Sequence, residues 1–292
     1  GLGGVAVGNR ALASRAGPLP PAIVGEQHTT RWRGFEVAYA TAGDPEDPDV
    51  LLLHGLHAAG TSQEFDAIVD ELAEDHHVVV PDLPGFGRTD RPPVTYTAGL
   101  YQEFVADFAA EHTENATCIA TSLTGAYAAD AAAEAEFSRL VLVCPTDDVG
   151  PRRRWLRGLF RAPVVGQGLF NLLVSRPSLE YFDDREAYYG GADQATRDYQ
   201  WRTAHQSGAR YAPASFVGGY LTPAASLPET LGEIDIPVTL VWGREATTTP
   251  LSTGRTLAEQ ADARLVVVDD ARLLPHHEHP EQFLDAIAPA LD

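Results

Sequence analysis

The sequence predicts an α/β fold in which a mostly parallel sheet is covered by helices on both faces and is interrupted by a helical insertion. Short, continuously apolar runs alternate with amphipathic helical patterns over most of the 292 residues. That order is typical of a parallel sheet buried on both faces. Between about residues 146 and 228 the alternation stops, and Arg and aromatic clusters take its place. A chain of this length can form one large domain with such an insertion.

In the first half of the chain, predicted strands and helices follow one another in order. FEVAYATAG alternates as a half-buried strand does, and DVLLLHG is apolar enough for a strand covered on both faces. In the helical pattern that follows, Phe65, Ile68 and Leu72 share one face. The remaining elements of this half are a strand in HHVVVPDL, a helix in TAGLYQEFVADFAAEH, a strand in ATCIAT, a helix over about 123–135 and a strand in RLVLVCP.

After the insertion the alternation resumes. The predicted elements are a strand in IPVTLVWGRE, a helix in PLSTGRTLAEQA, a strand in ARLVVVDDA and a helix in PEQFLDAIAPAL. The sequence therefore divides into four parts: an N-terminal segment (1–32), a first core part (33–145), a helical cap (146–228) and a second core part (229–292).

The charge balance is strongly acidic. The chain carries 41 acidic and 21 basic residues, and it contains no Lys. A surface with a net charge of −20 repels nucleic acid and anionic lipid, so neither is an expected partner. The composition fits a cell with a salty interior, where ~1 M salt screens charges beyond ~3 Å. A GC-rich genome would explain the missing Lys but not as well the acid excess, so we expect a halophilic protein.

The sequence lacks long apolar segments and metal-binding Cys or His spacings, and these absences underlie the predictions for compartment and cofactors. No apolar run approaches the ~20 residues that a membrane span needs, and the N-terminal segment has no apolar block of the secretory type. We therefore expect a cytoplasmic protein, with a two-fold dimer as the default if it associates. Cys118 and Cys144 lie inside apolar runs and form no metal-binding spacing with His or Cys. They are predicted to be buried thiols, and neither a metal nor another cofactor is expected.

Three short motifs stand at the ends of consecutive predicted strands. His54, Gly55 and Leu56 end one strand, PDLPGFGRTDRP follows the next, and IATSLTG places Ser122 between a strand and a helix. A serine in a strand-to-helix turn is the context of a nucleophile elbow, where the hydroxyl projects from the edge of the sheet. In that arrangement the N–H groups of Leu56 and Leu123 would form an oxyanion hole.

With these motifs the sequence resembles the α/β-hydrolase superfamily, in the branch of capped esterases and epoxide hydrolases. The resemblance covers roughly residues 33–292. Its most specific motifs are HG at 54–55, DLPGFGRTDRP at 82–92, VWGRE at 241–245 and PHHEHPEQF at 275–283. It implies an α/β-hydrolase fold with an eight-stranded, mostly parallel sheet and a helical cap, and a catalytic triad of Ser, His and an acid.

At two of the three triad positions implied by the resemblance, the residue has no side chain that can act as an acid or a base. Ala246 follows VWGRE, where the superfamily places its Asp, and Leu273 stands where it places its His. At the elbow, Ala120 and Thr124 replace the two glycines of the G-x-S-x-G pattern. A free Ser hydroxyl is a poor nucleophile unless a base lies within about 2.6–3.2 Å. Catalysis by Ser122 therefore needs a base and an acid from other positions.

Three histidines are candidates for the missing base. His276, three residues beyond Leu273, is the first, although it can equally pack behind its loop. His54 can act as the base or hold the geometry of its loop. His205, in the cap, can hang over Ser122 or serve in ligand recognition and lid packing. His54, Gly55 and His205 are all expected to line the pocket.

For the acid, Asp147 is the first candidate because it follows the strand RLVLVCP, and some members of the superfamily carry their acid there. An ordinary loop or N-cap role is its alternative. Glu245, next to Ala246, is a second substitute.

Three functions from different classes remain after these substitutions. The first is a hydrolase of a carboxylic ester or similar acyl compound, with Ser122 as nucleophile and a relocated or incomplete triad. The second is a non-catalytic descendant that binds an apolar small molecule or a partner. The third is a lyase that uses the oxyanion hole without a full triad. Retention of Ser122 favours the first function, and the loss of His and Asp favours the second.

Overall fold

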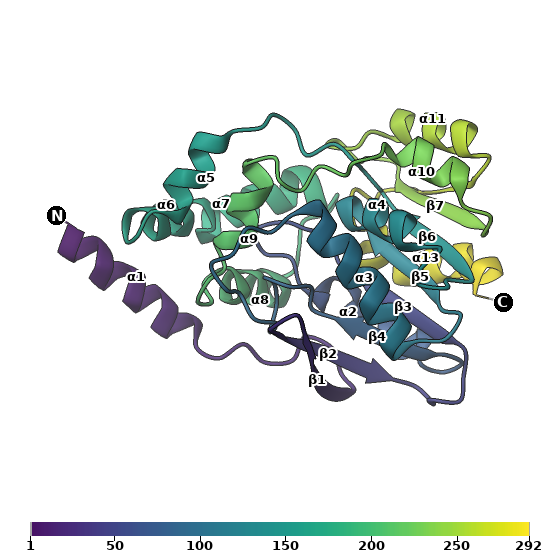
Figure 1. The fold of residues 1–292 in the computed structure, drawn as a ribbon, viewed down its shortest axis with the longest axis horizontal. Helices are drawn as coiled ribbons and strands as arrows, with labels where there is room; N and C mark the ends of the chain where they lie inside the picture. Colours follow the sequence, from purple (N-terminus) through teal and green to yellow (C-terminus); the bar gives the residue numbers. More distant parts are fainter. Residues whose placement is uncertain (1, 292) are drawn as a thin grey trace.

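The computed structural model describes residues 2–291 and contains a single eight-stranded sheet with the strand order β1-β2-β4-β3-β5-β6-β7-β8 (Figure 1). β2 pairs antiparallel with both β1 and β4, and every other neighbouring pair is parallel. The eight-stranded, mostly parallel sheet implied by the sequence is therefore confirmed.

The strands are short, and most of them carry the apolar runs of the sequence. Their bounds are β1 Glu26–Trp32, β2 Phe35–Ala42, β3 Asp49–Leu53, β4 His77–Pro81, β5 Thr117–Thr121, β6 Arg139–Val143, β7 Val238–Gly243 and β8 Arg264–Val268.

Helices connect these strands. The α-helices are α1 Leu2–Ala16, α2 Asp66–Leu72, α3 Ala98–His112, α4 Ser122–Ala131, α5 Arg154–Arg161, α6 Val165–Leu173, α7 Arg176–Phe182, α8 Gln194–Ala204, α9 Tyr211–Val217, α10 Leu227–Glu233, α11 Leu251–Ala261, α12 Pro275–Glu278 and α13 Pro280–Ile287. Shorter turns are the 3₁₀ helices η1 Ser62–Phe65 and η3 Ala288–Ala290, and the π-helical turn η2 Asp183–Ala187. Among residues 2–291, no helix combines the length and apolar character of a membrane span.

Alternate residues of the central strands face two different layers of helices. Leu51 and Leu53 of β3 belong to the core cluster that includes α3 and α4. Val50 and Leu52 belong to the cluster that includes α2 and α13. All four are almost completely buried. Continuously apolar strands are what a sheet covered on both faces requires, because successive side chains point to opposite faces.

The sheet begins earlier in the chain than the motifs indicate. β1 pairs with β2 along its whole length, so it belongs to the sheet although it falls inside the N-terminal segment 1–32. The hairpin turns at Arg33 and Gly34, which both have positive φ values, of 46° and 89°. The strand EQHTTRW is mostly polar and its burial alternates, which is typical of an edge strand with one solvated face.

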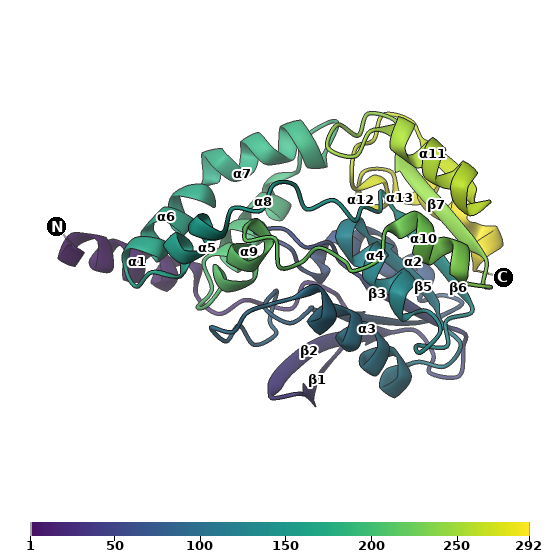
Figure 2. The same ribbon diagram turned by 45° about the horizontal axis from the view of Figure 1, so that its top comes forward.

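Between β6 and α10 the described chain is helical, and α5 to α9 gather at one end of the sheet, next to α1 (Figure 2). Asn9 of α1 donates to the carbonyl of Val164, at 3.0 Å, and accepts from Asn171 of α6, at 2.9 Å. The N-terminal helix therefore packs on the cap, an arrangement that the Gly- and Arg-containing segment gave no reason to expect.

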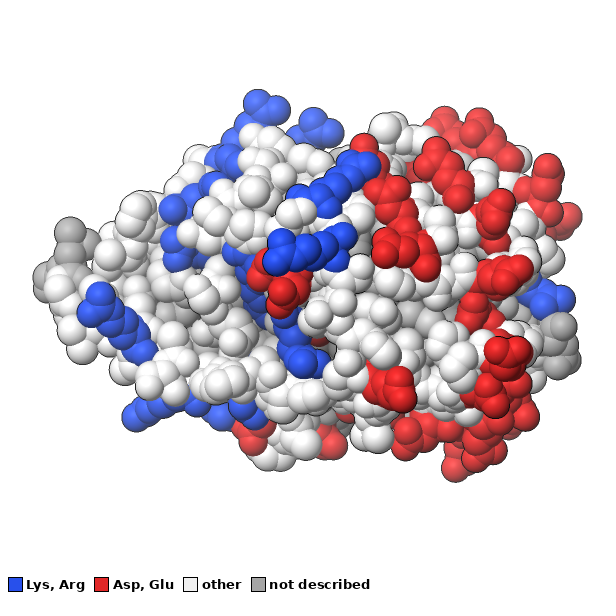
Figure 3. Space-filling view, turned by 60° about the horizontal axis from the view of Figure 1, so that its bottom comes forward, with Lys and Arg blue, Asp and Glu red and all other residues white. Residues whose placement is uncertain are grey.

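Charge is divided unevenly between the cap and the core. The cap, residues 146–228, holds ten of the 21 Arg residues but only eight of the 41 acidic residues. On the face shown in Figure 3, Arg side chains gather toward the end formed by α1 and the cap, and carboxylates cover the opposite end. The acidic excess of the protein is thus carried by the α/β core.

Candidate active site

Ser122 lies in a sharp turn between β5 and α4. Its φ of 52° falls in the left-handed region, which a non-Gly residue rarely adopts. Such a conformation costs roughly 1–3 kcal/mol and persists where the surrounding structure enforces it. Here β5 ends at Thr121 and α4 begins at Ser122 itself, so the turn has no spare residue. The backbone therefore has the form of a nucleophile elbow.

The elbow accommodates Thr124 by giving its hydroxyl a partner. Thr124 is fully buried, and its Oγ1 donates to the carbonyl of His54 at 2.8 Å. This bond ties the first turn of α4 to the end of β3. Gly125 favours close packing, because a Cβ there would lie 3.1 Å from Pro145 Cβ, tighter than an ordinary contact. The shift of the glycine by one place thus preserves the tight packing of helix against strand.

The backbone N–H groups of Leu56 and Leu123 are the oxyanion donors that the sequence predicts. Leu123 is the second residue of α4, so its N–H is one of the first-turn groups that no helix carbonyl can accept. The Leu56 N–H, in the loop after β3, makes no bond to a backbone acceptor within residues 2–291. Neither group therefore has an internal acceptor among the described residues, as the donors of an oxyanion hole must not.

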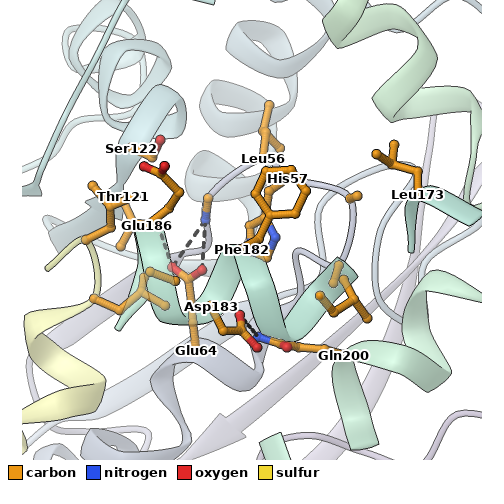
Figure 4. A pocket seen from close by; sticks show the side chains of 17 residues that line it. Leu56, His57, Glu64, Thr121, Ser122, Leu173, Phe182, Asp183, Glu186 and Gln200 are labelled. Atoms are coloured by element: carbon orange, nitrogen blue, oxygen red, sulfur yellow. Dashed lines mark hydrogen bonds between the residues drawn. The ribbon is translucent and has the colours of Figure 1, made fainter. Parts of the chain in front are cut away.

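A cavity of about 270 Å³ adjoins the elbow (Figure 4). Core loops form one wall, and the cap forms the other. The lining residues are Gly55, Leu56, His57, Ala58, Ala59, Glu64, Thr121, Ser122, Leu173, Leu179, Phe182, Asp183, Glu186, Ala187, Gln200, Leu273 and Leu274. A largely apolar cavity with a few polar groups is the usual form of a small-molecule site.

Glu64 is a buried carboxylate next to the elbow. It accepts hydrogen bonds from the Gly55 N–H, 3.2 Å from each oxygen, and from the hydroxyl of Thr121. A Cβ placed on Gly55 would lie 3.5 Å from Ser122 Cβ and 3.8 Å from Glu64 Oε2. Burial raises the pKa of Glu64 to about 7. Glu64 and Ser122 therefore both adjoin Gly55, and the carboxylate can exchange a proton close to neutral pH.

Sequence patterns gave no signal for Glu64. It stands in η1, at the start of a helical pattern, where an acidic residue is ordinarily solvated and favoured by the helix dipole. Only the folding of η1 against the loop after β3 buries it.

The cap segment η2 packs against the two loops in which the triad acid and base were expected. Glu186 Oε2 accepts from the hydroxyls of Thr247 and Thr248, directly after Ala246. The Leu273 N–H donates to the carbonyl of Ala187 at 3.2 Å. Ala246 itself is buried, and Leu273 lines the cavity. Backbone and cap groups therefore occupy the space around these two positions.

A family model described as "Alpha/beta hydrolase family" matches residues 50–286. The chain belongs to this family. A curated relative, the pimeloyl-[acyl-carrier protein] methyl ester esterase of Aeromonas hydrophila, is 28% identical over 251 residues, which cover 83% of this chain and 94% of the relative. An uncharacterized hydrolase of Saccharomyces cerevisiae is 42% identical over 59 residues, only 20% of either chain.

The fold is also similar to solved hydrolase structures. A serine hydrolase described as involved in carbazole degradation matches with a TM-score of 0.75 at 20% identity, over 91% of this chain and 98% of that one. At this identity the match supports the fold alone.

In this α/β hydrolase, His276 lies behind Glu64 rather than in the cavity wall. The ring is fully buried between Phe65 and Phe283, with centroid distances of 5.0 and 5.6 Å. Its Nε2 is 3.9 Å from Glu64 Oε1, and neither ring nitrogen has a hydrogen-bond partner among the described residues. Burial lowers the pKa of His276 to about 3, so the ring is neutral at pH 7.

His54 holds the loop after β3. Its Nε2 accepts from the Leu83 N–H at 3.0 Å, which leaves the proton on Nδ1 to be donated to the Gly55 carbonyl at 2.9 Å. Burial lowers the pKa of His54, in keeping with this neutral form. Gly55 lines the cavity, but the ring of His54 does not.

Asp147 and His205 both lie away from the Ser122 cavity. Asp147 Oδ2 accepts from the Leu227 N–H at 2.6 Å and lines a separate groove beside α10 and α11. His205 stacks on Trp201 at 4.3 Å, and its Nδ1 is 2.7 Å from the Trp201 carbonyl. It lines a groove between α1 and α6. The structure therefore does not bring either residue to Ser122.

One histidine that the sequence did not single out does line the cavity. His57 follows Leu56 in the loop after β3, and its side chain is exposed. Desolvation lowers the pKa of His57 to about 4, so its ring is neutral at pH 7. Its place directly after the His-Gly-Leu motif was the only signal available.

Proposed function

We propose that the protein is a serine hydrolase that acts on a carboxylic ester or a similar acyl compound, with Ser122 as the nucleophile. The observation that carries the proposal is the strained turn at Ser122, on the wall of a largely apolar cavity. The free N–H groups of Leu56 and Leu123 support it, since they can bind the negative charge that develops on a substrate carbonyl. The esterase named among the relatives is consistent with this substrate class.

Glu64 is the proposed proton acceptor. A general base works best when its pKa is close to the working pH, and burial gives Glu64 a pKa of about 7. Ser122 Oγ attacks the carbonyl carbon while its proton passes to Glu64, directly or through one water. The leaving alcohol then takes that proton. In the second half of the reaction, water attacks the acyl-enzyme, gives a proton to Glu64 and releases the acid, and the proton returns to Ser122.

His276 fits a positioning role in this scheme. Its neutral ring lies against Glu64, with one N–H that has no partner within residues 2–291. A small movement of the carboxylate would allow a hydrogen bond that stabilises its charged form. His57, also neutral, is the other group in the cavity that can accept a proton.

A second function, binding without catalysis, is favoured by a different observation. Leu273 lines the cavity where the family base was expected, and Ala246 stands in place of the acid. The cavity would then hold an apolar ligand without reaction. A lyase that relies on the oxyanion donors alone is the third alternative.

Fluorophosphonate labelling and hydrolysis of 4-nitrophenyl butyrate in 2 M KCl distinguish these functions. We expect wild type to be labelled, and Ser122→Ala to lose both labelling and turnover. Glu64→Gln should reduce kcat/KM by about 10²–10⁴-fold and remove a rise in rate with an apparent pKa near 7. Glu71→Gln, an exposed change on α2, is the matched control.

Each alternative has its own result. An unlabelled wild-type protein without turnover would favour the binding function. Full activity in Glu64→Gln, with loss in His57→Ala, would assign the base to His57 instead. If His276→Ala loses activity while Glu64→Gln and His57→Ala keep it, the base is His276.

A further inference from the structure

The charged groups that line the Ser122 cavity are all of one sign. Glu64, Asp183 and Glu186 contribute carboxylates, and no Arg from the described part of the chain lines the cavity. Acidic groups alone would not identify a ligand, because the chain carries 41 acidic residues. The cap, however, is the part of the molecule richest in Arg, and its Arg side chains are not among the lining residues.

Two polar side chains in the cap wall carry oxygens without partners. Asp183, the first residue of η2, and Gln200, on α8, are only 5% and 6% exposed. Gln200 Nε2 donates to Asp183 Oδ1 at 3.2 Å, and this bond fixes which atoms remain. Asp183 Oδ2 and Gln200 Oε1 have no hydrogen-bond partner among the described residues. The pair therefore has two buried oxygens that can accept a hydrogen bond but receive none within residues 2–291.

Buried acceptors without partners are rare because each one forfeits its hydrogen bonds to water. Both residues line the cavity, although the two oxygens themselves have almost no accessible surface, so a bound molecule reaches them once these side chains turn toward it. Figure 4 shows the Asp183–Gln200 pair apart from Ser122, with apolar side chains such as Phe182 and Leu173 also around the space. The cavity thus combines the elbow serine, apolar side chains and a pair of acceptors that needs a hydrogen-bond donor.

We propose that the substrate of this hydrolase carries a protonated amine, which Asp183 Oδ2 and Gln200 Oε1 bind while its ester or acyl carbon lies at Ser122. The inference rests on the proposed function, since it names the class of substrate for that site. An ammonium group supplies several donors and a positive charge, so it satisfies both acceptors and pairs with the carboxylate. A substrate with a carboxylate at this end would meet the Asp183 carboxylate without a lining cation from the described part of the chain, and is disfavoured.

Binding of small amphiphiles to the Ser122→Ala protein tests this inference independently of catalysis. Hexylamine, 1-hexanol and hexanoate have similar apolar bodies and differ in the terminal group. In titration calorimetry in 0.5 M KCl, we expect hexylamine to bind at least about tenfold more tightly than 1-hexanol, the size of one charge-assisted hydrogen bond. Hexanoate should bind most weakly.

Variants assign the preference to the pair. Asp183→Asn keeps the shape and removes the charge, so it should abolish the preference for hexylamine over 1-hexanol. Glu180→Gln, an exposed change on α7, should retain it. The proposal is overturned if hexylamine and 1-hexanol bind the Ser122→Ala protein with equal affinity. It is also overturned if a folded Asp183→Asn protein still prefers hexylamine to 1-hexanol by the same factor.

Turnover separates this inference from the proposed function. In wild type, 4-nitrophenyl 6-aminohexanoate should have a kcat/KM at least about tenfold above that of 4-nitrophenyl heptanoate, through KM. Selective amine binding without any turnover would reject the hydrolase and keep the amine site. Turnover of both esters at equal kcat/KM would reject the amine site and keep the hydrolase.

Discussion

At the scale of single residues, Glu64 has a consequence for stability as well as for chemistry. Its carboxyl group is buried in contact with Gly55 and Thr121, and burial raises its pKa from 4.5 to about 7. Between these two values the folded protein retains a proton that the unfolded chain has released. The free energy of unfolding therefore falls as the pH rises through this window, and becomes independent of Glu64 above it.

Replacement of Glu64 by Gln should remove this pH dependence. For wild type we expect the Glu64 contribution to decrease by about 2 kcal/mol between pH 5.5 and 8. Urea unfolding in 2 M KCl at several pH values measures it as the difference between wild type and Glu64→Gln. Asp183, whose pKa burial raises to about 6, titrates in both proteins and cancels in that difference. Parallel pH profiles for the two proteins would contradict the prediction.

At the scale of elements, η2 joins the cap to the core at the edge of the cavity. Arg272 donates from Nη1 to the carbonyls of Asp184 and Tyr188, the latter at 3.2 Å. Glu278 accepts from the backbone N–H groups of Arg272 and Tyr189, at 2.7 and 2.5 Å. Two core side chains thus hold the backbone within η2, the turn that supplies Asp183 and Glu186, and directly after it.

Arg272→Ala should loosen this segment without unfolding the protein. Each lost hydrogen bond contributes about 1 kcal/mol, so amide exchange over residues 183–190 should accelerate by about tenfold or more. Hydrogen exchange followed by mass spectrometry gives the rate for that peptide. Arg244→Ala removes a guanidinium that pairs with Asp269 at the surface, and should leave the segment unchanged. Unaltered exchange in Arg272→Ala would mean that other contacts fix η2.

At the scale of the whole molecule, the division of charge concerns stability in salt. The core carries most of the acidic residues, and the cap carries nearly half of the Arg residues (Figure 3). Like charges on the core repel one another in the folded state, and salt screens that repulsion. Adaptation to a salty interior is our proposal for this composition.

We expect the melting temperature to rise by about 5–10 °C between 0.05 and 1 M KCl, corresponding to a few kcal/mol of relieved repulsion. Most of the rise should come below about 0.5 M, because the screening length changes most there. Calorimetry at several KCl concentrations measures it, and sucrose, which is excluded from protein surfaces without screening charge, serves as control. A melting temperature that does not change with KCl would reject the halophilic interpretation.

The local parts of this fold could be predicted because they depend on the order of residues along the chain. Continuous apolar runs identify strands buried on both faces, as in β3 and β5. A serine between such a strand and a helix identifies the elbow, where the structure does place Ser122. The edge strand β1 was missed because its polar sequence carries only weak alternation, and α1 was missed because Gly and Arg interrupt its pattern.

The sequence by itself thus determined the parallel sheet, the elbow and the absence of a His and an Asp at positions 273 and 246. Only the tertiary structure decided which polar groups share the cavity. Glu64, Asp183, Glu186 and Gln200 come from separate elements of core and cap, and no periodicity marks their burial. Apolar periodicity reports one face of one element, whereas a site forms where loops from several elements meet. For that physical reason His276 lies behind Glu64, and the Glu64 carboxylate lies against Gly55 and Thr121.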